Sequence, residues 1–390
     1  MSELLESRWS DTKSALLEGL SGTKKSVMAT TLENTRKYLS ESAGAGATSA
    51  GNVATLNRVI LPVIRRVMPT VIANELVGVQ PMTGPVGQIH TLRVRYADTF
   101  NDGASGATAG EEALSPFKIA ESYSGATTGK AANTAALEGA AGNKLSIQIL
   151  KQTVEAKSRK LSARWTFEAA QDAQSMHGID VEAEIMAALA QEITAEIDQE
   201  VIGSLVTLSG GAAQTYNQGT VSGTATFVGD EHAALAVQIN RASNLIAQRT
   251  RRGAGNWAVV SPFALTILQS ATTSAFARTT EGVFEAPTNT KMVGTLNNAM
   301  KVYVNTYAAD SSPVLIGYKG ASESDAAAFY CPYIPLMSSG VVLDPTSFEP
   351  VVSFMTRYGY VELNNTASSL GNAADYLANV AITDTSVSFS

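Results

Sequence analysis

The chain has 390 residues, of which 45% are apolar and 16% charged, and its formal net charge is −7. The apolar fraction excludes a disordered chain, and the length allows two or three packed units of roughly 150 residues each. The negative balance argues against a sequence-independent DNA-binding surface, which needs clustered Lys and Arg. Because typical soluble domains carry roughly 25% charged residues, the low charge favours a subunit whose surface is covered by neighbours.

The cysteine content and the apolar runs indicate the compartment. Cys331 is the single cysteine, so an intrachain disulfide is excluded and a reducing compartment is favoured. The N-terminus carries Glu3 and Glu6 and has no apolar segment typical of a secretory signal. No run approaches the roughly 18 apolar residues of a membrane span, so no membrane association is expected.

Residues 1–42 place apolar side chains at helical spacing, and Trp9 belongs to the first stripe. Residues 42–52, SAGAGATSAGN, are typical of a flexible linker. Because residues 1–52 have too few apolar residues for a core of their own, we expect them to form an arm that packs on another part of the assembly.

The next segments predict a helix, a joint and a protruding arm. Residues 56–67 have helical spacing, 79–87 are rich in turn residues, and 88–97 alternate as a half-exposed strand. Residues 98–143 are rich in glycine and small residues, and alternation resumes over 151–173 with Val154, Ala156, Leu161, Ala163, Trp165 and Phe167. Two long strands joined by a glycine-rich tip are therefore predicted.

The segment 178–205 predicts the longest helix. Apolar residues recur at every fourth position from Val181 to Leu205, and Asp180 is the expected N-cap. At 1.5 Å per residue this gives a rod of roughly 40 Å. The acidic residues of this segment, which could also suggest acid–base chemistry, are interpreted as its solvated face (Glu182, Glu184, Glu192, Glu196, Asp198 and Glu200).

A second α+β region follows, with further strands in 341–390. A helix is expected over 230–250, a buried strand over 256–262 with a short helix after it, and strands over 300–307, 313–320 and 325–336.

The chain offers little catalytic chemistry. His90, His177 and His232 are isolated and have no metal-ligand spacing, so no metal or cofactor is expected. GATTGKA (125–131) has too short a glycine spacing for a phosphate-binding loop, and Ala131 replaces the hydroxyl residue that binds magnesium. No catalytic residue is predicted.

Three separated blocks resemble the major capsid proteins of T-even-type contractile-tailed bacteriophages. These are LVGVQPMTGPVGQIHTLRVRY (76–96), VEAEIMAALAQEITAEIDQEV (181–201), and GYKGASESDAAAFYCPYIPL with FEPVVSFMTRYGY (317–336 and 348–360). The resemblance implies an α+β HK97-like capsid fold with an N-terminal arm, an extended β-hairpin loop, a peripheral domain with a long spine helix, and an axial domain. The expected parts are the arm (1–55), the first peripheral part (56–97), the extended loop (98–160), the peripheral domain with spine helix 178–205 (161–228), the axial domain (229–345) and the return strands (346–390).

The resemblance implies a structural subunit, not an enzyme, located in the virion after assembly in the host bacterial cytoplasm. Hexamers and pentamers of the subunit would close into an icosahedral head that encloses double-stranded DNA without specific binding. Portal, scaffold and prohead protease are the implied assembly partners, and decoration proteins are further candidates. Two alternatives remain: an encapsulin-like nanocompartment shell, and a soluble enzyme that uses the glycine-rich segment as a lid.

Four residues are singled out for function. Trp9, Trp165 and Arg357 are the candidates for contacts between subunits. The resemblance makes Glu41 a candidate site for the prohead protease, because Leu39-Ser40-Glu41 fits its pattern, although we expect the arm to be retained as a clasp between subunits. Arg357 interrupts an apolar strand and is predicted either to hold a carboxylate in an ion pair or to be an edge-strand charge that discourages wrong pairing.

Overall fold

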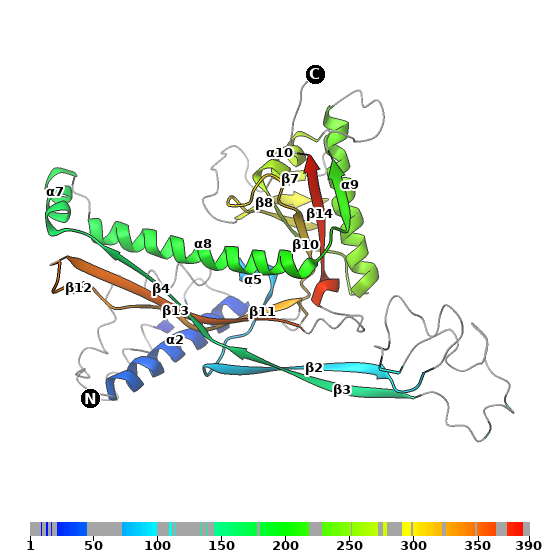
Figure 1. Ribbon diagram of the computed structural model, residues 1–390, viewed down its shortest axis with the longest axis horizontal. Coiled ribbons are helices and arrows are strands. Elements are labelled where there is room, and N and C mark those ends of the chain that lie inside the picture. Colours follow the sequence, from blue (N-terminus) through cyan, green and yellow to red (C-terminus); the bar gives the residue numbers. More distant parts are fainter. Residues whose placement is uncertain are drawn as a thin grey trace. The chain divides into compact units, whose positions relative to one another are not determined.

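The computed structural model describes residues 9, 13–14, 17, 22–44, 72–99, 109–110, 113, 134, 138, 144–177, 180–217, 228–250, 252–271, 276–278, 291–297, 299–321, 325–347, 349–363 and 373–384. The chain divides into two compact units (Figure 1). The first unit consists of Met1–Gly87, Val154–Val201 and Phe329–Val361, and the second of Gln88–Thr153, Ile202–Ala328 and Glu362–Ser390. The predicted α+β class is confirmed.

A five-stranded sheet forms the centre of the first unit. Its order is β1-β11-β13-β12, and β4 pairs with β13 as well. The strands are β1 (Gly78–Val79), β4 (Lys157–Arg164), β11 (Ala328–Ser338), β12 (Val342–Leu343) and β13 (Pro350–Glu362). β13 pairs antiparallel with β4 along eight residues, from Val351 opposite Arg164 to Tyr358 opposite Lys157. β13 therefore lies between β11 and β4 and is an inner strand.

The long helix α8 (Val181–Ser209) runs along one face of this sheet (Figure 1). Its start is as predicted, because the Asp180 carboxylate accepts from the backbone N–H of Glu182 at 3.1 Å. Its buried residues follow the fourfold spacing, including Ile193, Ile197, Val201 and Leu205. The helix ends four residues later than the sequence indicated.

Three shorter helices complete the described part of the first unit. α2 (Gly22–Gly44) buries Val27, Met28 and Leu32. Its Asn34 side chain donates to the backbone carbonyls of Met82 (2.6 Å) and Tyr333 (3.1 Å), which holds the helix against the unit. The helix α5 is Ala73–Leu76 and α7 is Phe167–His177. The predicted helix over 56–67 lies outside the described residues.

The alternating segment 151–173 is not one strand, which corrects the sequence interpretation. β4 ends at Arg164, and Trp165 is followed by α7. The hydroxyl of Thr166 accepts from the backbone N–H of Ala169 at 3.3 Å, as an N-cap does. Because Glu168, Ala169 and Ala170 favour helix, this local signal outweighs the continued alternation.

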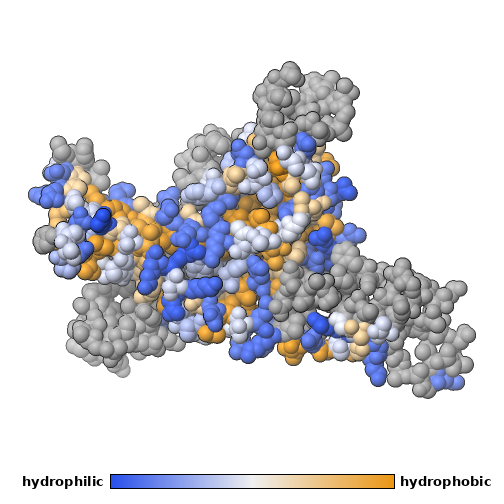
Figure 2. All heavy atoms as spheres, viewed as in Figure 1, coloured by the Kyte–Doolittle hydropathy of each residue, from blue (hydrophilic) through white to orange (hydrophobic). Residues whose placement is uncertain are grey.

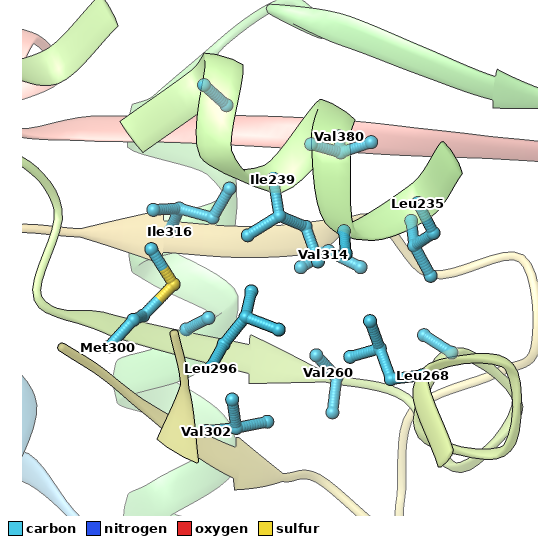
Figure 3. Close-up of a cluster of buried hydrophobic side chains, with 14 of the residues drawn as sticks. Leu235, Ile239, Val260, Leu268, Leu296, Met300, Val302, Val314, Ile316 and Val380 are labelled. Carbon is cyan, nitrogen blue, oxygen red and sulfur yellow. The ribbon is translucent and has the colours of Figure 1, made fainter. Parts of the chain in front are cut away.

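The second unit is built on a seven-stranded sheet of order β5-β14-β10-β6-β9-β8-β7. The strands are β5 (Gln214–Asn217), β6 (Trp257–Val260), β7 (Phe276–Arg278), β8 (Lys291–Leu296), β9 (Met300–Val304), β10 (Val314–Gly317) and β14 (Leu377–Asp384). The helices are α9 (Val228–Thr250) and α10 (Pro262–Ser270), with a short 3-10 helix, η3 (Ala373–Tyr376). Figure 3 shows how Leu235 and Ile239 of α9 meet Val314 and Val380 of the sheet in the core.

One strand lies in a different sheet from that expected. The strand β11 was expected in the same region as the strands at 300–307 and 313–320, but it pairs with β13 and β1 in the first sheet. The strand β14, near the C-terminus, joins β10 and β5 in the second sheet. Sequence order alone does not carry this information, because both sheets are assembled from distant segments.

A separate two-stranded sheet consists of β2 (Val86–Tyr96) and β3 (Leu145–Glu155). β2 corresponds to the strand predicted over 88–97, whereas β3 begins before the predicted segment 151–173 and overlaps only its first residues. Most of the residues between them lie outside the described part of the chain.

Candidate functional site

A polar cluster in the first unit joins the sheet to α8. Arg159 of β4 contacts the carboxylates of Glu196 and Glu200, which are one turn apart on α8. Its Nε donates to the hydroxyl oxygen of Tyr358 on β13 at 2.8 Å, and that hydroxyl donates to Glu200. Three elements that are distant in sequence are thus connected by one guanidinium, whose planar fork suits two carboxylates.

The tyrosines in this cluster are buried between sheet and helix. The rings of Tyr330 and Tyr358 have their centroids 5.3 Å apart. Burial, together with the hydrogen bond to Glu200, raises the pKa of Tyr358 far above its ordinary value. The hydroxyl therefore stays protonated and acts as a donor to Glu200. Burial also raises the pKa of the Cys331 thiol to about 11, which makes it an unreactive core residue.

Asp198 lies in the same interface and corrects one interpretation of the sequence. It was grouped with the solvated acidic face of the long helix, but only 1% of it is exposed. One carboxylate oxygen accepts from the backbone N–H of Ile72 at 2.9 Å, and the other is buried without a hydrogen-bond partner among the described residues. Burial raises the pKa of Asp198 to about 7.

Arg357 occupies the opposite face of the sheet from Tyr358. Along β13 the even positions from 350 to 358 are buried and the odd positions from 351 to 357 are half-buried. The Arg357 guanidinium lies over the Tyr333 ring, 5.4 Å from its centroid. The edge-strand interpretation is wrong, because β13 is an inner strand. No described carboxylate forms an ion pair with Arg357, so a pairing between subunits stays a prediction.

The two tryptophan candidates have contacts within the chain. The Trp9 indole nitrogen donates to Glu33 of α2 at 3.4 Å, and Lys13 also binds this carboxylate. Trp165 is half-buried, and its backbone N–H donates to the carbonyl of Pro350 at 3.2 Å. Both positions stay predictions for contacts between subunits. Glu41 lies in the last turn of α2, and the structure does not describe its side chain.

Apolar side chains are exposed in several places. On β3 the exposed residues that alternate along the strand are apolar: Leu145 is exposed by 47%, Ile147 by 69% and Ile149 by 66%. In the first unit, Phe167 and the segment 341–343 are also exposed. Figure 2 shows apolar residues in orange along the part of the first unit that holds α8 and β4. Such patches mark interaction surfaces.

In the second unit the motif around Tyr318-Lys319-Gly320 forms a latch with Asp325. Asp325 accepts from Arg252 at 2.7 Å and from the Tyr376 hydroxyl at 3.3 Å. A Cβ at Gly320 would overlap the Asp325 side chain. These contacts close the loops next to β10 and explain the motif by structure, not by catalysis.

The described residues contain no group of three or more His, Cys, Asp or Glu that could hold a metal ion. No helix among them is long and apolar enough to cross a membrane. The described residues instead form exposed apolar surfaces and the polar clusters around Arg159 and Asp325, which hold elements of the fold together.

The family model described as Major capsid protein Gp23 matches residues 53–386. The chain belongs to this family. It is 30% identical to the major capsid protein of Enterobacteria phage T4 over 425 residues, which cover 86% of this chain and 80% of that protein. It is 29% identical to the major capsid protein of Vibrio phage KVP40 over 424 residues, covering 85% and 82%.

Solved structures with similarity to this capsid subunit include one from Mycobacterium phage Bobi and the capsid of Myoviridae phage XM1. The first has a TM-score of 0.48 at 14% identity and covers 80% of this chain and 90% of that chain. The second has a TM-score of 0.45 at 10% identity and covers 80% and 92%. Family membership confirms the predicted function: the chain is a structural subunit of a phage capsid and is located in the virion.

Arg159, which joins β4 to α8 and β13, was not singled out from the sequence. Arg357 was singled out because it interrupts an apolar strand, whereas Arg159 lies among other cations in KSRKLSAR. A signal was available in Glu196 and Glu200, which have the four-residue spacing of one helix face and can bind one arginine together.

Proposed function

We propose that this capsid subunit assembles into hexamers and pentamers that close into an icosahedral head around double-stranded DNA. Portal, scaffold and prohead protease are proposed partners during assembly, with decoration proteins added to the finished head. The family assignment supports this proposal. We also propose that the subunit has no catalytic activity, which the family assignment supports.

The exposed stripe of β3 is the observation that carries the proposal. Leu145, Ile147 and Ile149 lie on one face of the two-stranded sheet, because alternate residues of a strand share a face. Full burial of such side chains is worth about 1.5–3 kcal/mol each. A neighbouring copy that covers this stripe would gain that free energy, whereas a monomer leaves the stripe in water.

The domain assignment is proposed on the same basis. The arm is 1–55, the extended loop 98–160 contains β3, and the peripheral domain contains α8. The axial domain, 229–345, contains α9, α10 and most strands of the seven-stranded sheet. The pairing of β11 with β13 supports placing β11 with the peripheral sheet.

We propose that the arm is retained and acts as a clasp between subunits. The peptide bond after Glu41 lies inside the last turn of α2. A helical turn is a poor protease substrate, since proteases cut extended, exposed segments. Mass spectrometry of virion-derived subunits should therefore find residues before Ser42, and subunits that begin at Ser42 would contradict this part of the proposal.

Electron microscopy of the expressed protein tests the proposed function. Shells, tubes or rings of capsomers are expected. Shells that hold enzymes and no DNA would favour the nanocompartment, and a small discrete particle with turnover would favour the enzyme. Deletion of residues 101–143 sharpens the test: circular dichroism should show an intact fold while assembly fails, and loss of folding would mean that this segment is core.

A further inference from the structure

One face of the β4–β13 strand pair is basic, with exposed side chains on β4 and half-buried side chains on β13. Directly opposite residues of antiparallel strands share a face. The register places Ser158 opposite Arg357, Lys160 opposite Met355, and Arg164 opposite Val351. The three β4 residues are exposed. We call the surface formed by Ser158, Lys160, Ser162, Arg164 and Arg357 the basic strand face.

The other side of the same strands is already occupied. Arg159, which alternates with Ser158 and Lys160, points to Glu196 and Glu200 of α8. The acidic residues of this helix are thus on the far side of the sheet from the basic strand face. β4, β11 and β13 carry no acidic residue before Glu362, so these strands cannot neutralise the face.

Two of its three cations have no ion-pair partner among the described residues. Arg164 lies 3.6 Å from Glu349, but no described carboxylate is within ion-pair distance of Lys160 or Arg357. The Nε of Arg357 is buried and has no hydrogen-bond partner in the described structure. The Tyr333 ring holds this guanidinium in place. Arg357 as a whole is half-buried, and a planar guanidinium held in place in this way is suited to binding a carboxylate.

We propose that the basic strand face binds carboxylates of a second copy of this chain. This inference rests on the proposed self-assembly. Charge complementarity identifies the occupant: the chain carries a net charge of −7, so the remaining surface of a neighbouring copy is rich in carboxylates, and assembly brings copies together. Arg357 binds one carboxylate through its fork, and Lys160 adds a second positive charge beside it.

Zero-length crosslinking of assembled particles tests the contact directly. Subunits labelled with ¹⁴N and ¹⁵N are mixed before assembly, and a carbodiimide joins amines only to carboxylates in contact. Peptides that join Lys160 to an Asp or Glu are expected with mixed isotopes. If other lysines give mixed-isotope crosslinks and Lys160 gives none, the inference is wrong.

Substitution of Arg357 tests its energetic role. Arg357→Met is expected to raise the protein concentration needed for assembly about tenfold or more. A few central residues carry most of the binding free energy of an interface, so truncating one of them weakens it strongly. Arg357→Lys, which keeps the charge and loses the fork, should fall between Met and wild type. Arg241→Met changes an exposed arginine of α9 and is the control. Circular dichroism and thermal melts of the unassembled variants separate folding defects from assembly defects.

The outcomes are distinguishable from failure of the proposed function. Wild-type protein that forms no particles would overturn the proposed function and this inference with it. Normal wild-type shells with unchanged assembly of Arg357→Met would overturn the inference alone. If Arg357→Met assembles normally in the absence of DNA but its shells fail to retain DNA, the basic strand face binds phosphate. That result would also overturn the inference.

Discussion

Replacing Asp198 with Asn should make the stability of the subunit less dependent on pH. The Asp198 carboxyl is buried against α5, and its pKa is raised to about 7 by burial. In the unfolded chain an aspartate has a pKa of about 3.9. Between these values the folded state binds more protons than the unfolded state, so stability falls as pH rises. The contribution of Asp198 is complete below about pH 4 and is lost as pH rises through about 7.

The size of the effect follows from the shift. Each pKa unit corresponds to about 1.4 kcal/mol, so the two units between pH 5 and pH 7 correspond to about 2–3 kcal/mol. Asn keeps the carbonyl that accepts from Ile72 N–H but adds a buried donor without a partner, which costs about 1–3 kcal/mol at every pH. The diagnostic quantity is therefore the free energy of unfolding of Asp198→Asn minus that of wild type. What matters is how this difference changes with pH.

Urea unfolding of the unassembled subunit at pH 5 and pH 8 measures this quantity. The free energy of unfolding of Asp198→Asn, relative to wild type, should rise by about 2–3 kcal/mol from pH 5 to pH 8. Other groups titrate equally in both proteins and cancel. Glu192→Gln removes an exposed carboxylate from the same helix and isolates the effect of charge on α8. A difference that stays constant with pH would refute the reasoning.

Three further changes test other parts of the subunit. Arg159→Met should lower the free energy of unfolding by about 1–3 kcal/mol in urea denaturation, because it breaks two partly exposed ion pairs and a hydrogen bond to a buried tyrosine; an unchanged value would mean that the cluster is not a clamp. Gly317→Ala should cost about 1–3 kcal/mol or more, since the added Cβ would overlap the Trp257 ring in the seven-stranded sheet, and soluble expression with a wild-type melting temperature would contradict this. Ile149→Ser should leave circular dichroism unchanged and weaken assembly in sedimentation, while Gln148→Ser, on the alternate face of β3, should do neither; equal effects of the two would contradict the role of the stripe.

The sequence predicted the elements whose signals are local. The long helix, the strand β2 and the helix α9 all lie close to their expected bounds, because hydrophobic periodicity and capping residues act over a few positions. The strand β3 begins at Leu145, before the expected start at 151. The strand expected to continue to Phe167 ended at Arg164, since the Thr166 cap and the helix-forming residues after it were not weighed against alternation. Asp198 also had a readable signal: it lies four residues after the buried Thr194 and three before Val201, on the edge of the apolar stripe.

The sequence by itself determined the family, the α+β class and the self-assembling character of this capsid subunit. The order of the motifs, the low charge and the periodic apolar residues can all be recognised without knowing which segments pair in space. Only the tertiary structure decided which arginine binds the helix and which lies on the opposite face of the sheet. Arg159 and Arg357 lie on neighbouring strands, Arg159 opposite Thr356 and Arg357 opposite Ser158. Their side chains therefore point to opposite faces of the sheet. That assignment depends on register between segments almost 200 residues apart, and a one-residue shift of β4 would turn Arg159 away from α8.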